Sequence, residues 1–263
     1  MKPNTEVIPF AEVLKTVEKA FKLVEMLAEK PMTFTEMVSK AKSNKATIHR
    51  FLSTFDQLGY ITKDHQEKYY LSQQWFQIAQ KASDNLDLNS IARPYLQSIA
   101  EKVNESTFLA QFVGDQVLYV EKMESQSAAR IVLGVGKHAP LYCVASGKLY
   151  LAHLTEKQLD SYFLRNKLEA HTENTITSRT QLIVELEKVR KNGYAIDREE
   201  WEKGLKGIAF PIYNARNELA GALCVAGLSY RFDDEVMEKA IILGKHATKD
   251  LSLRLGFINK GEL

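Results

Sequence analysis

Glycine is distributed very unevenly along this chain, and the distribution divides it into two parts of different character. Gly59 is the only glycine among the first 113 of the 263 residues, and the other twelve come later. Because glycine is unfavourable inside helices and favoured in turns, the first part should be mostly helical and the second richer in strands and turns. The length exceeds one ordinary domain and falls short of three. We therefore expect two folded domains.

The composition is that of a globular protein with a hydrophobic core, at 45% hydrophobic and 26% charged residues. The formal net charge of +2 excludes a polycation, so a nucleic-acid function must depend on where the charges lie. The start of the chain lacks the apolar core of a signal peptide, and no stretch approaches the roughly 20 apolar residues that cross a bilayer. We expect a cytoplasmic protein that does not associate with membranes.

The N-terminal part has the element order of a winged helix-turn-helix. Apolar residues recur at helical spacing over 13–28, and a short helix is predicted over 35–41. A tight turn over 42–44 leads to a third helix over 46–58. Residues 60–72 predict a β-hairpin with a polar tip. Helix, helix, turn, helix and hairpin is the order in which winged helix-turn-helix domains are built.

The charge pattern around the third helix favours DNA binding. No acidic residue lies between Glu36 and Asp56, whereas several basic residues do. A helix that enters the major groove approaches two rows of phosphates, so cations and hydroxyls belong there and carboxylates do not. The alternative is a three-helix bundle with a solvated basic face, which the acid-free stretch and the hairpin make less favourable. The predicted DNA-contacting residues are Thr33, Thr35, Lys42, Ser43, Asn44, Lys45, Thr47, His49 and Arg50.

The remaining chain predicts an α+β fold with an antiparallel sheet. A long helix is expected from Gln74 towards Asn89 and another from Pro94 to Val103. Beyond these helices, strands and hairpins alternate irregularly with helices, which is typical of an α+β domain. The predicted strands lie at 107–113, 116–123, 129–135, 207–213 and 219–228, and the predicted helices include one that begins near Ala145 and one from Asp233 to about Leu255.

Four stretches make the chain similar to the IclR family of bacterial regulators. They are FTEMVSKAKSNKATIHRFLSTFDQLGYI, YYLSQQWFQIA, GKHAPLYCVASGKLYLA and NGYAIDREEWEKGLKGIAFPIYN, within a resemblance that extends from Val13 to Gly256. ENTITS, followed by the last of these stretches, resembles the branch that represses pectin and ketodeoxygluconate catabolism. The resemblance implies a DNA-binding domain over 10–73, a linker helix over 74–92 and a GAF-like effector domain over 93–258.

The resemblance also implies a homodimer or homotetramer on a double-stranded DNA operator, with a small organic acid as effector and 2-keto-3-deoxygluconate as the candidate. Asp197 is where relatives often place an acid against the ligand, and a surface carboxylate is the alternative. The small residues Ala145, Ser146 and Gly147 open a helix whose free N–H groups suit a carboxylate. An ordinary helix start packed on a sheet explains these three equally well.

The other predicted effector contacts lie on the last hairpin and in two apolar positions. Cys224 and Ala226 point to one face of their strand, where relatives often carry hydroxyls, and Gly207 lies on the strand before. Ile131 and Ala139 would add apolar wall, although core packing is the alternative for Ile131. Cysteine and alanine at positions 224 and 226, in place of the hydroxyl side chains of relatives, make the predicted wall less polar.

The rival interpretation is a thiol-dependent enzyme whose N-terminal bundle only dimerises. Its nucleophile would be Cys143 or Cys224, the two cysteines of the chain. His138 and His153 are near Cys143 in sequence, but no orienting carboxylate accompanies them. The histidines lack metal-binding spacing, and we expect neither a metal nor a cofactor. The basic third helix favours a regulator. We expect a repressor, with an activator as the alternative, because the sign of control depends on the position of the operator.

Overall fold

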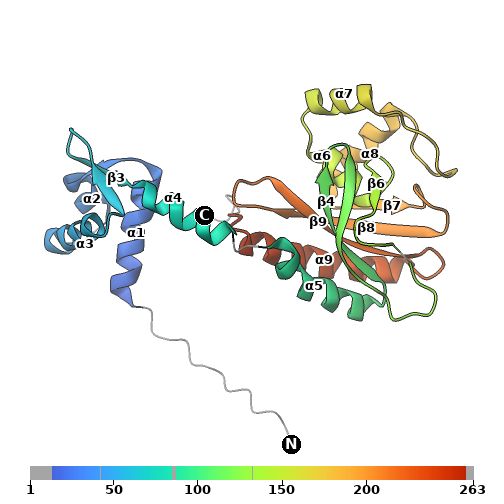
Figure 1. The fold of residues 1–263 in the computed structure, drawn as a ribbon, viewed down its shortest axis with the longest axis horizontal. Helices are drawn as coiled ribbons and strands as arrows, with labels where there is room; N and C mark the ends of the chain where they lie inside the picture. Colours follow the sequence, from blue (N-terminus) through green and yellow to red (C-terminus); the bar gives the residue numbers. More distant parts are fainter. Residues whose placement is uncertain (1–13, 42, 85–86, 132, 259–263) are drawn as a thin grey trace, which may run out of the picture. The chain divides into compact units, whose positions relative to one another are not determined.

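The computed structural model describes residues 14–41, 43–84, 87–131 and 133–258. The chain forms two compact units, Met1–Asn85 and Leu86–Leu263 (Figure 1). Among the described residues, no helix combines the length and the hydropathy that crossing a bilayer requires.

The first unit is a helical bundle with a small sheet. Its elements are α1 (Lys15–Glu29), β1 (Met32–Thr33), α2 (Phe34–Ala41), α3 (Lys45–Gln57), β2 (Ile61–Lys63), β3 (Lys68–Leu71) and α4 (Gln73–Asp84). The strands form an antiparallel sheet in the order β1-β3-β2, in which β2 and β3 are the expected hairpin and β1 is an addition. Leu23, Met37, Ile48 and Leu52 are fully buried in its core. The winged helix-turn-helix prediction is confirmed.

The second unit is an antiparallel sheet covered by helices. Its elements are α5 (Leu88–Val103), β4 (Ser106–Val113), β5 (Gln116–Met123), β6 (His138–Pro140), α6 (Ala145–His153), α7 (Glu156–Arg165), α8 (Arg179–Asn192), β7 (Ala195–Arg198), β8 (Leu205–Tyr213), β9 (Leu219–Leu228) and α9 (Asp234–Arg254). The strand order is β6-β5-β4-β9-β8-β7. The predicted α+β class is confirmed.

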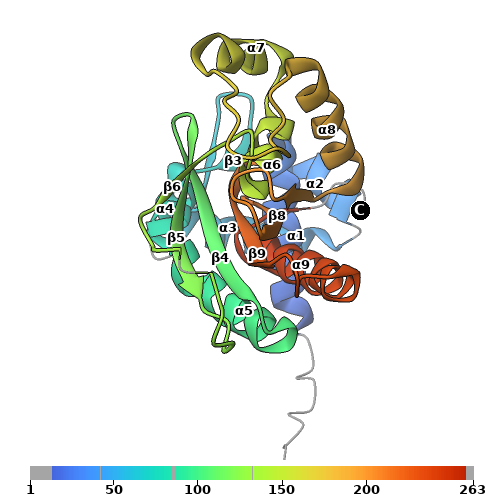
Figure 2. The same ribbon diagram turned by 90° about the vertical axis from the view of Figure 1, so that its right-hand side faces the viewer.

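The two faces of this sheet carry side chains of different size. On β8, Ile208, Phe210 and Ile212 pack against α5 and α9, whereas Ala209 faces α6. On β9, Leu223 packs with the side chains that face α5 and α9, whereas the smaller Ala222 and Cys224 pack on the side of α6. Figures 1 and 2 show α5 and α9 along one face and α6 and α8 along the other. Alternation with period two therefore gives one closely filled face and one face with spare volume.

Two predictions about the second unit are wrong. The described residues of 129–135 form no strand, and the sheet ends beyond β5 with β6, which is only three residues long. The apolar side chains Ile131 and Leu133 pack against the core beside the sheet. The helix predicted to begin at Pro94 begins at Leu88, because the Asp87 carboxylate caps it by accepting from the N–H groups of Asn89 and Ser90.

Gly147 lets α6 approach the chain segment that precedes it. A Cβ atom at this position would lie 2.2 Å from the carbonyl oxygen of Leu141. Backbone atoms cannot move aside as the tip of a side chain can. Any other residue at position 147 would therefore displace the start of α6.

Gly147→Ala should lower the stability of the second unit by about 2 kcal/mol or more, since the added methyl overlaps backbone. Thermal unfolding followed by circular dichroism measures the loss. Gly134→Ala is the matched control, because its Cβ would make only an ordinary contact, 3.7 Å from Lys137. Equal melting temperatures for the two variants would contradict the overlap at Gly147.

Candidate DNA-binding surface and effector cavity

Helix α3 presents a basic face and buries an apolar one. Asn44 caps it, with its side-chain Oδ1 accepting from the N–H of Thr47 at 2.7 Å. Lys45, His49 and Arg50 are exposed, and the first turn contains no acidic residue. Lys45 thus lies at the positive end of the helix dipole and Arg50 lies in the following turn, an arrangement that suits phosphate binding.

The structure places the other predicted DNA contacts around this helix. The hydroxyl of Thr33 donates to the Glu36 carboxylate at 2.8 Å and accepts from its N–H, so this threonine caps α2. Thr35 is exposed on α2, and Ser43 is half-buried just before α3. Lys42 lies outside the described residues.

The hairpin tip adds residues that the sequence analysis did not select. His65 and Gln66 are exposed between β2 and β3. The Asp64 side chain shapes the turn by accepting from the N–H groups of Gln66 at 2.8 Å and Lys68 at 2.9 Å. The only sequence signal for this tip is its run of polar residues.

A cavity of about 360 Å³ lies in the second unit, between the sheet and the start of α6. It brings together seven of the nine predicted effector contacts: Ile131, Ala145, Ser146, Asp197, Gly207, Cys224 and Ala226. Ala139 and Gly147 are not among the lining residues. Ala139 is buried in the core opposite Val117 of β5, and Gly147 packs on Leu141.

Small side chains in neighbouring strands create this cavity. Asp197, Gly207 and Ala226 are register partners across β7, β8 and β9, and the adjoining row contains Ala209 and Cys224. Because four of these five side chains are no larger than a thiol, the sheet leaves space below α6. Cys224 and Ala226, which alternate to one face of their strand, therefore help to form the cavity.

The start of α6 supplies unpaired donors to the cavity. The first intrahelical bond runs from Lys148 N–H to Val144 O, so the N–H groups before it lack helical partners. The hydroxyl of Ser146 lies close to the side chains of Tyr119 and Cys224 but makes no hydrogen bond of full geometry among the described residues, although its residue is only 1% exposed. A buried hydroxyl with poorly satisfied hydrogen bonds is costly, and a carboxylate ligand would satisfy it together with the helix N–H groups.

Asp197 is buried, contrary to the surface-loop alternative. It is 9% exposed, and its Oδ1 accepts from the N–H of Glu200 at 2.8 Å. Burial raises the pKa of Asp197 to about 7, and the nearby negative charge of Glu200 acts in the same direction. Near neutral pH the carboxyl therefore exists in both forms, and its protonated form can donate to a bound acid.

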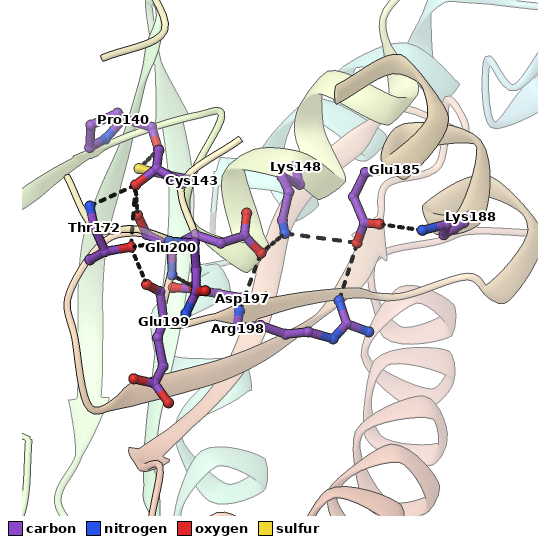
Figure 3. Close-up of polar contacts among 12 residues, drawn as sticks. Pro140, Cys143, Lys148, Thr172, Glu185, Lys188, Asp197, Arg198, Glu199 and Glu200 are labelled. Atoms are coloured by element: carbon purple, nitrogen blue, oxygen red, sulfur yellow. Dashed lines mark hydrogen bonds and ion pairs between the residues drawn. The ribbon is translucent and has the colours of Figure 1, made fainter. Parts of the chain in front are cut away.

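A buried ion cluster, which sequence analysis missed, holds the cavity walls together. Lys148 on α6 is 0% exposed and lies 2.5 Å from Glu200 and 3.9 Å from Glu185 (Figure 3). Glu185 on α8 also pairs with Arg198 at 3.3 Å. The available signal was a single charged residue in the otherwise uncharged start of α6.

The two cysteines lack the surroundings of a nucleophile. Cys143 and Cys224 are both free and buried. Burial raises the pKa of the Cys143 thiol, as do Asp197 and Glu200, and burial raises the pKa of Cys224 to about 12. Thiols with raised pKa values are poor nucleophiles, because the thiolate is the reactive form.

Asp197→Asn should stabilise the second unit at pH 8.5 by more than it does at pH 5.5. The folded-state pKa of about 7 lies above the ordinary aspartate value of 3.8, so the folded chain binds the extra proton between these values. The contribution of Asp197 to stability therefore falls as the pH rises towards 7. Above pH 7 the substitution replaces a buried negative charge with a neutral amide, which should raise the free energy of unfolding by about 1–3 kcal/mol. Melting temperatures at both pH values test this, and an equal gain at both would contradict it.

Both units match one protein family. Residues 16–65 match the "IclR helix-turn-helix domain", and residues 80–253 match "Bacterial transcriptional regulator IclR C-terminal". The "HTH-type transcriptional regulator KdgR" of Escherichia coli is 28% identical over 97% of each chain. The "Acetate operon repressor" of Salmonella typhimurium is 28% identical over 97% of this chain and 95% of the relative.

The fold agrees with these matches. The crystal structure of the Thermotoga maritima IclR protein superposes with a TM-score of 0.63 at 26% identity, covering 93% of this chain and all of that one. The thiol-enzyme alternative finds no support in the cysteine environments or in these relatives. The chain belongs to the IclR family and is a ligand-responsive, DNA-binding transcriptional regulator.

Proposed function

We propose that this protein is a cytoplasmic repressor that leaves its operator when a small organic acid enters the cavity beside α6. The observation that supports this most is that several groups suited to a carboxylate lie together around Ser146. A buried hydroxyl with no hydrogen bond of full geometry, helix N–H groups without helical partners and a carboxyl that is half protonated near neutral pH all lie at one cavity. A carboxylate ligand can accept from the hydroxyl, the helix N–H groups and the protonated carboxyl, so it needs no positively charged side chain beside it.

The DNA-binding part of the proposal rests on α3 and the wing. Residues 10–73, of which 10–13 lie outside the described residues, would form the DNA-binding domain. The exposed Lys45 and Arg50 would contact phosphates, while Thr47, which is half-buried near the start of the helix, would lie close to base edges. Two copies of α3 in a homodimer or homotetramer would recognise a palindromic operator.

The coupling is proposed to pass through the segment 74–92, in which α4 ends the first unit and α5 begins the second. A ligand that binds one arrangement of the dimer more tightly shifts the population towards it. In the arrangement with ligand, the paired recognition helices would have a spacing that does not fit the operator.

The resemblance makes 2-keto-3-deoxygluconate the first acid to test, since the chain is similar to KdgR along its whole length. Fluorescence anisotropy on the DNA upstream of the protein's own gene tests repressor and effector together. Binding that one acid reverses supports both proposals. Binding that no acid reverses would leave a DNA-binding protein with a different signal.

Arg50→Ala should weaken binding to all DNA sequences similarly and lower the salt dependence by about one phosphate contact. The slope of log affinity against log salt concentration measures this. Arg216→Ala is the matched control, because it removes the same charge from an exposed turn of the second unit. If both variants keep the slope of the parent protein, Arg50 does not contact phosphate.

Asp197→Ala should abolish release by the effector and leave operator affinity unchanged, because the substitution removes a cavity group and nothing in the first unit. The control is Asp160→Ala, which removes an exposed carboxylate of α7 that pairs with Arg179. Anisotropy titrations with and without effector distinguish the two. Normal release from the Asp197 variant would remove this residue from the binding site.

A further inference from the structure

We propose that the effector cavity selects an acid with an apolar body the size of an aromatic ring, in preference to a polyhydroxylated acid of similar length. This inference rests on the proposed effector function and specifies its ligand class. It also departs from the sugar acid that the sequence resemblance favours.

The strongly polar groups of the cavity lie mainly at its two ends. At the buried end are Ser146 and Asp197, which suit one carboxylate. Arg130 and Glu202 line the cavity from exposed positions and therefore mark its outer end. Arg130 is already engaged there, because its guanidinium lies 2.9 Å from the carboxylate of Glu124.

Between these ends the wall consists largely of hydrocarbon. The half-buried side chains of Ile131, Leu133, Trp201, Leu205 and Leu228 line it from three separate segments of the chain. Apolar ligand surface gains free energy by leaving water for such a wall. Each ligand hydroxyl placed here without a partner would lower affinity by roughly tenfold, given the cost of a buried unpaired polar group.

The floor of the cavity has few hydrogen-bonding side chains. Gly207, Cys224 and Ala226 present no hydroxyl, amide or charge, and the thiol of Cys224 lies 3.8 Å from Ala222 O on its own strand. The buried Tyr119 and the half-buried Lys206 are the exceptions on the wall. Two such groups are fewer than the five hydroxyls of gluconate or the three hydroxyls of 2-keto-3-deoxygluconate.

The volume fits a ring with a short acidic arm. A cavity of roughly 150 Å³ lined by apolar side chains accommodates benzene. This cavity, at about 360 Å³, is more than twice that size. A ring lying over Cys224 and Ala226, with a carboxylate at Ser146, would use both the apolar wall and the unpaired donors.

Isothermal titration calorimetry on the full-length protein tests the inference with 3-phenylpropanoate and D-gluconate, two monocarboxylates of similar size. We expect the phenyl acid to bind at least tenfold more tightly, with a negative heat-capacity change from apolar burial. A Trp75→Phe variant, which leaves Trp201 as the only tryptophan, should report the phenyl acid by a change in fluorescence. Operator release by the same acid, measured by anisotropy, links binding to function.

Leu133→Gln gives the converse test, since it places an amide in the apolar wall. The substitution should lower the affinity for the phenyl acid about tenfold and reduce the difference between its affinity and that of gluconate. Leu164→Gln is the control, because Leu164 is 88% exposed on α7 and does not line the cavity.

The outcomes separate the two proposals. If gluconate binds as tightly as the phenyl acid or more tightly and releases the operator, the ligand class is overturned and the effector function stands. If neither acid binds and an operator complex survives every acid tested, both proposals fail.

Discussion

The pairing of Lys148 with Glu200 is the interaction on which the effector unit depends most. A fully buried ammonium group is very costly unless its charge is compensated, so α6, α8 and the segment after β7 must come together around it. That assembly places the start of α6 above the sheet. The Glu200 backbone in turn donates to Asp197, so the same cluster positions the buried carboxyl of the cavity. The same charged residues therefore stabilise the fold of this unit and position the carboxyl that lines its cavity.

The sheet resolves a conflict between stability and ligand binding by using its two faces differently. Phe210 and Leu223 fill the side that faces α5 and α9, where the packing has no ligand to accommodate. Ala209 and Cys224, on the same strands, leave room on the other side. A strand can serve both purposes because successive side chains point in opposite directions. The stability lost by leaving a cavity on one face is offset by the filled core on the other.

Much of this architecture follows from local sequence signals. The caps at Thr33 and Asn44 and the apolar spacing of the helices are short-range properties, so the DNA-binding unit could be predicted closely. The strand expected at 129–135 is wrong because apolar character alone does not distinguish a strand from a loop packed on a core. Asp197 could be selected only by resemblance, whereas Ser146 also follows from its place in the first turn of a predicted helix. Lys148 could not, since its partners lie 37 and 52 positions away and only the folded chain brings them together.

The two glycines near the cavity imply different evolutionary freedom. Gly147 is locked, because the backbone at Leu141 occupies the space a side chain would need. A Cβ at Gly207 would meet its nearest neighbours at 3.6–3.9 Å, which is ordinary contact. A mutation at position 207 can therefore reshape the cavity floor without disturbing the fold. Descendants of this protein could acquire new signals through single substitutions on the sheet, while the helix that receives the acid stays in place.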